Sequence, residues 1–241
     1  AAVTLSKLAE TVDIILICVS ADQDVLEIIH GLLDSIKPGT VVIDTSTVSS
    51  ETAKAAAKLL AGKPAYFLDA PVSGGVEGAK NGTLAMMVGG DLAVLEKVKP
   101  VLEAISTRIV YMGPTGFGQG TKAVNQIMAA GINQAVTEAL AFAQAEGLPL
   151  DKVIEVVSGG AAANWFLSHR GLSMTQQQYT PGFKLALHHK DLSICQAMAA
   201  NNLADLPLVE KTLSDYEQLM RAGYSGEDIS ALYRLKGQFS L

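Results

Sequence analysis

The first half of the chain alternates short apolar runs with longer stretches of mixed polarity. Apolar runs that are rich in β-branched residues and bounded by turn residues predict strands, and a continuous run predicts a strand buried on both faces. The strand candidates are residues 12–19, 40–44, 65–68, 84–88 and 108–111. Helical periodicity lies between them at residues 22–33, 50–60 and 92–105. This alternation predicts an α/β layer architecture with a mostly parallel sheet.

The pattern changes after Gly120, because no further strand candidate follows. Helical periodicity runs without a break from Gln119 to about Glu146, which predicts one unusually long helix. Further helices are predicted over residues 150–158, 183–201, 207–222 and 226–233, most of them separated by Gly or Pro turn signals. The expected layout is an α/β domain over residues 1–113 and an all-helical domain over residues 114–241, built on the long helix that joins them.

Composition and charge narrow the class of protein. The 241 residues carry a formal net charge of −6 and no Lys/Arg cluster, which argues against nucleic-acid binding. The longest unbroken apolar run, Ile14 to Val19, is far shorter than the ~18 residues that a membrane span needs, and the N-terminus lacks a secretory pattern. Cys18 and Cys195 both lie in apolar runs, so we expect two buried thiols in a reducing, cytoplasmic setting.

The segment from Asp69 to Gly75 follows a predicted strand and carries the first candidate chemistry. Pro71 fixes one backbone torsion, and Gly74 and Gly75 give the chain unusual freedom, so we expect irregular structure here. Ser73 beside two glycine N–H groups could cradle a carboxylate. A Ser-Gly-Gly turn without such a role is the alternative.

Lys122 lies in the first turns of the long helix, and Asn125 and Gln126 follow it at the third and fourth positions. Residues at these spacings project from one helix face. A lysine of ordinary pKa, ~10.4, holds a proton that it can donate to a carbonyl oxygen, and partial burial would lower that pKa and allow the reverse transfer. A solvated polar helix face is the alternative.

Two further stretches suggest chemistry less strongly. His188 and His189 are adjacent and would point about 100° apart on a helix, so we expect no metal site there. The glycine spacing of residues 113–120 is unlike a phosphate loop, because no Lys-Ser/Thr follows it. We interpret it as a flexible segment that leads into the helix carrying Lys122 and allows other groups to come close to its backbone.

The order and spacing of four segments resemble the β-hydroxyacid dehydrogenase family. The segments are Asp69-Ala-Pro-Val-Ser-Gly-Gly-Val-Glu-Gly-Ala, Gly82-Thr-Leu-Ala-Met-Met-Val-Gly-Gly, Gly116-Phe-Gly-Gln-Gly-Thr-Lys-Ala-Val-Asn-Gln and His189-Lys-Asp-Leu. The resemblance covers essentially the whole chain. It implies a Rossmann-like dinucleotide-binding domain followed by an all-α domain. It also implies hydride transfer between NAD or NADP and a small hydroxy acid or semialdehyde, of the 3-hydroxyisobutyrate, tartronate semialdehyde, glyoxylate or succinic semialdehyde type.

The resemblance also implies roles for individual residues. Ser73, Gly74 and Gly75 would bind the substrate carboxylate. Lys122 would be the general acid/base, with Asn125 and Gln126 fixing the substrate. The positions that match the family's cofactor contacts are Val19, Asp24, Thr47, Phe183, Lys190 and Asp191. The expected partners are a small carboxylate substrate and further copies of the chain, as a homodimer or homotetramer through the helical domain, with no nucleic acid and no membrane.

The family opens with a βαβ unit carrying Gly-x-Gly-x-x-Gly, which would precede Ala1. In the strand order 3-2-1-4-5-6 the first strand here corresponds to strand 4, so we expect the native protein to have further N-terminal residues, ~30 or more. The residue that selects NAD or NADP lies in that unit. The main rival interpretation is a catalytically silent dehydrogenase-like module kept for binding or dimerisation, which retention of Lys122, Ser73 and Lys190 together disfavours.

Overall fold

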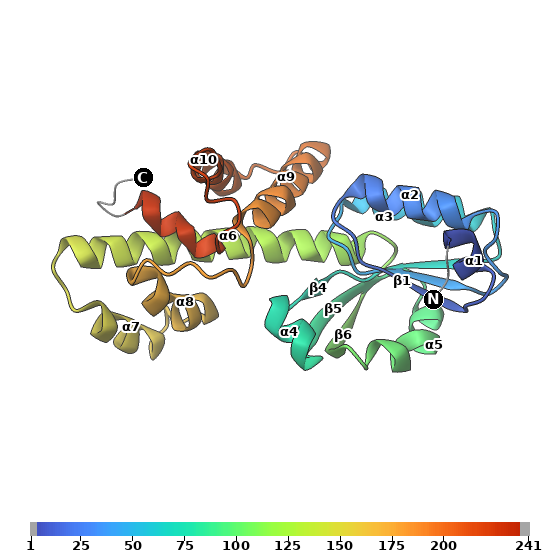
Figure 1. Ribbon diagram of the computed structural model, residues 1–241, viewed down its shortest axis with the longest axis horizontal. Coiled ribbons are helices and arrows are strands. Elements are labelled where there is room, and N and C mark those ends of the chain that lie inside the picture. Colours follow the sequence, from blue (N-terminus) through green and yellow to red (C-terminus); the bar gives the residue numbers. More distant parts are fainter. Residues whose placement is uncertain (1–3, 237–241) are drawn as a thin grey trace. The chain divides into compact units, whose positions relative to one another are not determined.

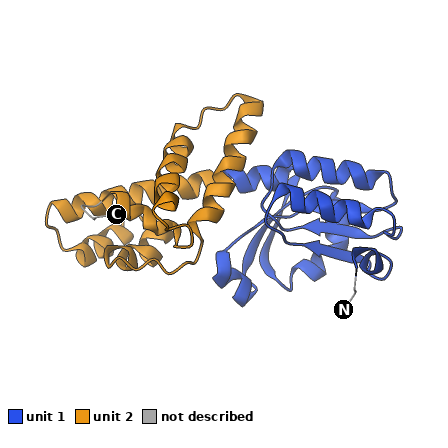
Figure 2. Cartoon of the chain, turned by 45° about the horizontal axis from the view of Figure 1, so that its top comes forward, with its two compact units in different colours: residues 1–124 blue, residues 125–241 orange. Residues whose placement is uncertain are grey.

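The computed structural model of the protein describes residues 4–236. By its internal contacts the chain forms two compact units, Ala1–Val124 and Asn125–Leu241 (Figure 2). The division falls inside one helix, α6 (Phe117–Ala145), so both units contain part of it. The domain boundary expected between residues 113 and 114 remains a prediction.

Unit 1 is built on a six-stranded sheet of mixed direction. Its strands are β1 (Ile14–Ile17), β2 (Val41–Asp44), β3 (Tyr66–Asp69), β4 (Val72–Ser73), β5 (Leu84–Gly89) and β6 (Ser106–Gly113). Their order is β1-β2-β3-β5-β4, with β6 also paired to β5. The β1–β2, β2–β3 and β5–β6 pairs are parallel, whereas β5 runs antiparallel to β3 and β4. The predicted mostly parallel α/β sheet is therefore confirmed.

Helices cover both faces of this sheet, as Figure 1 shows for α2 and α3 on one face and α5 on the other. The helices of unit 1 before α6 are α1 (Leu5–Ala9), α2 (Asp22–Leu32), α3 (Ser50–Ala61), α4 (Gly75–Asn81) and α5 (Leu92–Leu102). Successive strand residues point to opposite faces, so Val42 packs with α2 and α3 while Val41 and Ile43 pack with α5. The sheet is thus the middle layer between two apolar cores.

Side-chain caps fix where the helices of unit 1 begin. Ser49 accepts a hydrogen bond from Thr52 N at the start of α3, and Asp91 accepts one from Ala93 N at the start of α5. Each cap satisfies one of the N–H groups that have no partner inside the helix.

The expectation that the first strand is buried on both faces was wrong. Ile15 and Ile17 are buried, but Leu16 is 49% exposed, because helix α2 covers only one face of β1 and β1 pairs only with β2 in the described sheet. The expected burial of Cys18 was also wrong, because this residue, which directly follows β1, is exposed. Cys195 is buried as expected.

The segment from Asp69 to Gly75 is more regular than expected. Val72 and Ser73 form the short strand β4 against β5, and Gly75 begins helix α4. The two glycines make this turn from strand to helix, with φ of +132° at Gly74 and +61° at Gly75. The two glycines therefore mark a sharp turn between β4 and α4, and not a loop.

Within residues 125–236, the regular structure of unit 2 is helical apart from one isolated antiparallel bridge between Lys184 and Asp228. Besides the second part of α6, its elements are α7 (Leu150–Ser158), α8 (Trp165–Thr175), α9 (Leu185–Asn202), α10 (Pro207–Arg221) and the 3-10 helix η1 (Ile229–Leu235). Its core is formed by Leu140, Met174, Leu192, Tyr216 and Leu232, among others. Across residues 4–236, no helix is both long and apolar enough to cross a membrane.

Candidate active site

Ser73 and the two glycines after it lie at the carboxyl end of the short apolar segment that leaves β3. Ser73 is half-buried, and Gly74 and Gly75 are exposed. A Cβ at Gly74 would lie 3.2 Å from the side chain of Leu84, in a backbone conformation that residues with side chains rarely adopt. Glycine is therefore required at position 74 for the chain to turn from β4 into α4.

Lys122 lies on α6, one turn after the helix begins, and is only 8% exposed. Asn125 is half-buried and Gln126 is 2% exposed. The Asn125 amide nitrogen donates a 2.7 Å hydrogen bond to Gln126 Oε1. Because α6 is continuous through these positions, the three side chains occupy an arc of about 100° of its surface.

Asp69 links the segment that carries Ser73 to the helix that carries Lys122. Its carboxylate is fully buried at the end of β3. Gly116 N donates to Oδ1 at 2.8 Å, and Gln119 N donates to Oδ2 at 2.9 Å. A Cβ at Gly118 would lie 2.8 Å from Oδ2, so the absence of a side chain there leaves room for the carboxylate.

Gln119 makes a second connection from the first turn of α6, to the loop after β2. Its side chain, 1% exposed, donates to Ser46 O at 2.8 Å and accepts from Val48 N at 3.2 Å. Ser46 in turn accepts at Oγ from Val19 N at 2.9 Å. The loops that follow β1 and β2 are thereby joined to each other and to α6.

These loops carry the predicted cofactor contacts of unit 1. Val19 and Thr47 are half-buried and follow two adjacent parallel strands, at the edge where open α/β sheets bind dinucleotides. Asp24 accepts at its side chain from Ala21 N, which caps α2. These loops would suit a dinucleotide at that edge, and Asp24 holds the start of the neighbouring helix α2.

Burial raises the pKa of two carboxyls in this region. The pKa of Asp44 is raised to about 6, chiefly by burial, against the opposing effect of hydrogen bonds from the Ser46 hydroxyl and N–H. Burial also raises the pKa of Asp69, against the hydrogen bonds from Gly116 and Gln119. In both cases the loss of hydration exceeds the gain from the N–H donors.

The predicted residues of unit 2 form one connected polar group. Asp191 is buried, accepts at Oδ2 from Gln126 Nε2 at 2.7 Å, and lies 3.0 Å through Oδ1 from the ammonium of Lys190. Phe183, at the entry to α9, donates its N–H to Asp228 and packs its ring 5.2 Å from that of His188. Gln126, Lys190 and Asp191 therefore lie together, and Phe183 is joined to them through His188.

His188 is fully buried and holds the backbone of α6. Its Nε2 lies 3.2 Å from Gln126 O and its Nδ1 lies 3.0 Å from the Tyr216 hydroxyl. A carbonyl can only accept, so Nε2 carries the hydrogen and Tyr216 donates to Nδ1. Asn133 Nδ2 donates to the same hydroxyl at 3.0 Å. Among residues 4–236, no group of three or more His, Cys, Asp or Glu side chains could hold a metal ion.

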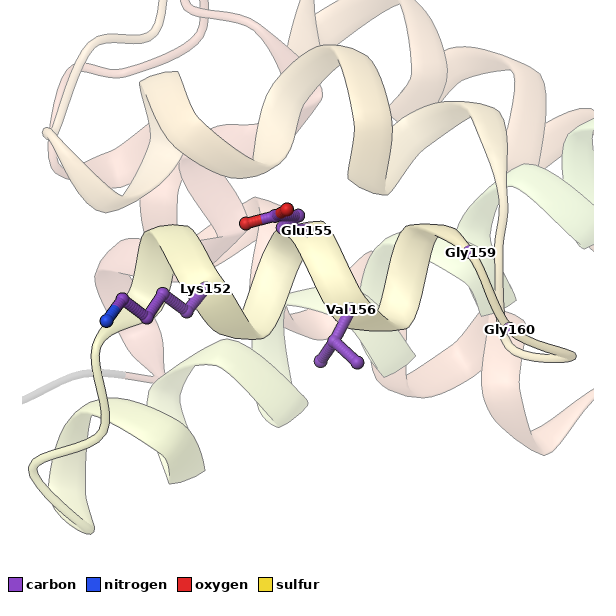
Figure 3. Close-up of a pocket in the computed structure, with 5 residues that line it drawn as sticks. All are labelled: Lys152, Glu155, Val156, Gly159 and Gly160. Atoms are coloured by element: carbon purple, nitrogen blue, oxygen red, sulfur yellow. The ribbon is translucent and has the colours of Figure 1, made fainter.

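Two surface hollows lie away from these residues. One, of about 550 Å³, is lined by Lys152, Glu155, Val156, Gly159 and Gly160. Figure 3 shows Lys152 extending toward the loop that precedes α7 and Glu155 projecting to another side of the helix, so the two charged groups do not converge. The other, of about 370 Å³, contacts Phe117, Gly120, Thr121 and Val124 of α6 together with Ser50 and Lys54. At 100° per residue, that face of α6 lies on the far side of the helix from Lys122.

Sequence reasoning did not single out Asp69, Gln119 or the packing role of His188. Asp69 was noted only as the first letter of a motif. One signal was available: a carboxylate at the end of a buried strand, with a proline two residues later, has little access to solvent and needs donors. The donors themselves lie about fifty residues further along the chain, and no local pattern identifies them.

Two family profiles together match almost the whole chain. The NAD binding domain of 6-phosphogluconate dehydrogenase matches residues 1–113. The NAD-binding domain of NADP-dependent 3-hydroxyisobutyrate dehydrogenase matches residues 116–236. A parallel-stranded nucleotide-binding unit followed by a helical unit of this kind defines an NAD- or NADP-dependent oxidoreductase that acts on a hydroxyl group.

Individual relatives agree with the profiles. The 2-hydroxy-3-oxopropionate reductase of Escherichia coli (strain K12) is 37% identical over 232 residues, which are 95% of this chain and 80% of that protein. The L-threonate dehydrogenase of the same strain is 33% identical and covers 94% of this chain and 76% of its own. The crystal structure of 3-hydroxyisobutyrate dehydrogenase from Salmonella typhimurium superposes with a TM-score of 0.85 at 32% identity, covering 96% of this chain and 82% of that one. The chain belongs to the β-hydroxyacid dehydrogenase family.

Proposed function

We propose that the protein interconverts a small β-hydroxy acid and its semialdehyde, with Lys122 as the general acid/base. The nicotinamide of NAD or NADP supplies or takes the hydride when it is bound. In reduction the Lys122 ammonium donates a proton to the carbonyl oxygen, and in oxidation the neutral amine takes the proton of the hydroxyl group. The observation that supports this most is the burial of Lys122, at 8% exposure, because a lysine is almost never fully buried unless its ammonium is paired.

The remaining roles follow the family resemblance. The Ser73 hydroxyl and the N–H groups of Gly74 and Gly75 would bind the substrate carboxylate. Asn125 and Gln126 would fix the substrate beside Lys122, and their mutual hydrogen bond would limit their rotation. A reacting group held in this way loses little further entropy on reaching the transition state.

The cofactor contacts divide between two sets of residues. Val19, Asp24 and Thr47 would serve it from the loops and helix start of unit 1. Phe183, Lys190 and Asp191 would serve it from unit 2, where the Lys190–Asp191 ion pair orients the ammonium.

The test of the proton-transfer role is Lys122→Ala in the full-length protein. We expect kcat to fall about 10²- to 10⁴-fold, while cofactor affinity, followed by fluorescence titration, is retained. Lys97→Ala, an exposed lysine of α5, is the matched control and should leave kcat unchanged. Full activity in Lys122→Ala would overturn the proposal.

A panel of hydroxy acids and aldehydes can identify the substrate. We propose testing 3-hydroxyisobutyrate and L-threonate as substrates for oxidation, and 2-hydroxy-3-oxopropionate, glyoxylate and succinic semialdehyde for reduction, each with both nicotinamides. Reduced-nicotinamide absorbance provides the rate. Binding of cofactor with no turnover of any substrate in the panel would favour the rival interpretation, a catalytically silent binding module.

We also propose that the protein is a cytoplasmic homodimer or homotetramer associated through its helical domain, which binds a small carboxylate substrate and neither nucleic acid nor membrane. Large apolar side chains of unit 2 are exposed in the single chain, among them Phe142 at 65%, Val156 at 72% and Trp165 at 61%. Exposed apolar surface of this kind is typical of interaction sites. Light scattering that finds only monomer at micromolar concentration would refute the assembly.

A further inference from the structure

Asp69 accepts hydrogen bonds at the start of α6, and a buried carboxylate in that place costs more stability than a neutral acceptor would. Serine or asparagine can cap a helix start with one neutral oxygen. Here a fully buried acid is used, although burial raises its pKa and so disfavours its charged form. A group that reduces stability in this way needs another reason to be present.

The contacts of Asp69 suggest such a reason. Its two oxygens accept from two N–H groups three residues apart, Gly116 at 2.8 Å and Gln119 at 2.9 Å. One acceptor would fix the distance of the helix start but leave it free to turn. Two acceptors on one planar group fix both the position and the rotation of the first turn.

The position and rotation of that turn determine where Lys122 projects. Lys122 follows Gln119 by three residues, so the two side chains lie about 60° apart around α6. Asp69 in turn precedes Ser73 by only four residues, with Ala70 and Pro71 between them both buried. The carboxylate is thus a short, direct connection between the Ser73 segment and the helix of Lys122.

We propose that Asp69 is a positioning residue for the reaction, which holds Lys122 in register with the Ser73 segment through the first turn of α6. This rests on the proposed function, in which Lys122 transfers the proton. Gln119 keeps the helix start attached to the loop after β2 independently of Asp69. Loss of the Asp69 carboxylate should therefore loosen the register of Lys122 without detaching the helix.

The first test is Asp69→Asn, which keeps the shape but presents an NH₂ group to one of the two N–H donors. It also removes a buried charge, so we expect the variant to fold with undiminished thermal stability. We expect kcat to fall about 10- to 100-fold on the panel substrate that is turned over fastest, with KM changed less than about twofold. Asp91→Asn is the matched control, because Asp91 also accepts a backbone N–H at a helix start, but on α5. It should leave kcat unchanged.

The second test combines Asp69→Asn with Lys122→Ala in a double-mutant cycle under single-turnover conditions. If Asp69 acts through Lys122, adding Asp69→Asn to Lys122→Ala should change the remaining rate by less than about twofold. The same fall in both backgrounds, or wild-type kcat in Asp69→Asn alone, would overturn the inference. Wild-type activity in Lys122→Ala would instead overturn the proposed function, and the inference with it.

A third measurement does not depend on activity. Asp69→Asn should speed amide hydrogen exchange at residues 117–122 by roughly five- to tenfold, as expected for one lost hydrogen bond, and leave α8 unchanged. Unchanged exchange in that turn would show that the carboxylate does not hold it.

Discussion

The two units bury carboxylates in different ways. In unit 1, Asp44 and Asp69 are held by N–H and hydroxyl donors, and burial raises the pKa of both. In unit 2, Asp228 accepts from the N–H groups of three residues and also meets the Arg170 guanidinium at 3.3 Å. Asp191 similarly has the Lys190 ammonium at 3.0 Å.

The two kinds of surroundings should give the carboxylates opposite effects on the stability of the fold. A cation beside a buried carboxylate offsets part of the lost hydration, and removing one partner leaves the other uncompensated. N–H donors alone offset less. We therefore expect the buried acids of unit 2 to stabilise the fold and those of unit 1 to destabilise it at neutral pH.

The largest effect on stability is expected for Asp228→Ala. It would leave three N–H groups, those of Gly182, Phe183 and Ser230, without an acceptor and Arg170 without its partner. We expect a loss of about 4 kcal/mol or more in the free energy of unfolding, at 1–3 kcal/mol per buried group. Chemical denaturation measures it, with the exposed Asp205→Ala as control. A loss below about 1 kcal/mol would contradict the stabilising role.

Asp44→Asn tests the opposite sign in unit 1. Because the folded pKa of Asp44, about 6, lies above the usual value of 3.8, the folded protein binds this proton more tightly than the unfolded chain. Its contribution to stability is thus present at low pH and is lost as pH rises from about 4 to 6. The variant should be more stable than wild type at pH 7–8, by at most about 3 kcal/mol.

That gain should disappear below pH 4, where wild-type Asp44 is protonated in both states. Denaturation midpoints across this range provide the measurement. A variant less stable than wild type at pH 8 would show that Asp44 is stabilised as a charge, as we expect for Asp228.

The smallest effects are expected at two glycines in the first turn of α6. A Cβ at Gly118 would overlap Met87 O most closely and would lie 2.6 Å from Asp69 O and 2.8 Å from Asp69 Oδ2, whereas a Cβ at Gly120 meets nothing within 4 Å. We expect Gly118→Ala to destabilise the protein by about 2 kcal/mol through overpacking. Gly120→Ala should stabilise it by about 0.5–1 kcal/mol, because alanine favours the helix. Equal effects on thermal unfolding would mean that α6 does not need to approach β3 and β5 closely at position 118.

The sequence predicted the layered α/β unit and the helical unit, because apolar periodicity is strong in most of their elements. It missed α8 (Trp165–Thr175), whose apolar residues do not form one clear stripe, and α1, which is only five residues long. It also missed the reversal at β5. Strand direction depends on where the chain crosses the sheet, and the single-residue pairing of Asp69 with Gly89 has no local pattern.

The candidate residues were found by their order in the chain, and their partners were not. Lys122, Asn125 and Gln126 share a helix face by spacing alone, so the sequence is sufficient for that statement. Their hydrogen-bond acceptors lie 50 or more residues away in the chain. Asp69 accepts from the first turn of α6, and Asp191 accepts from Gln126. Tertiary hydrogen bonds of this kind follow from the completed fold.

Because α6 is continuous, the number of residues between Lys122 and Gln126 sets the angle between their side chains around the helix axis. Inserting one residue between them would advance Gln126 by only about 1.5 Å but swing it by about 100° around the helix axis, away from the side on which Lys122 projects. Inserting four would restore the direction almost completely. Length changes in this stretch should therefore be tolerated in whole turns and rejected otherwise, whereas the loop after Gly147 is under no such periodic constraint.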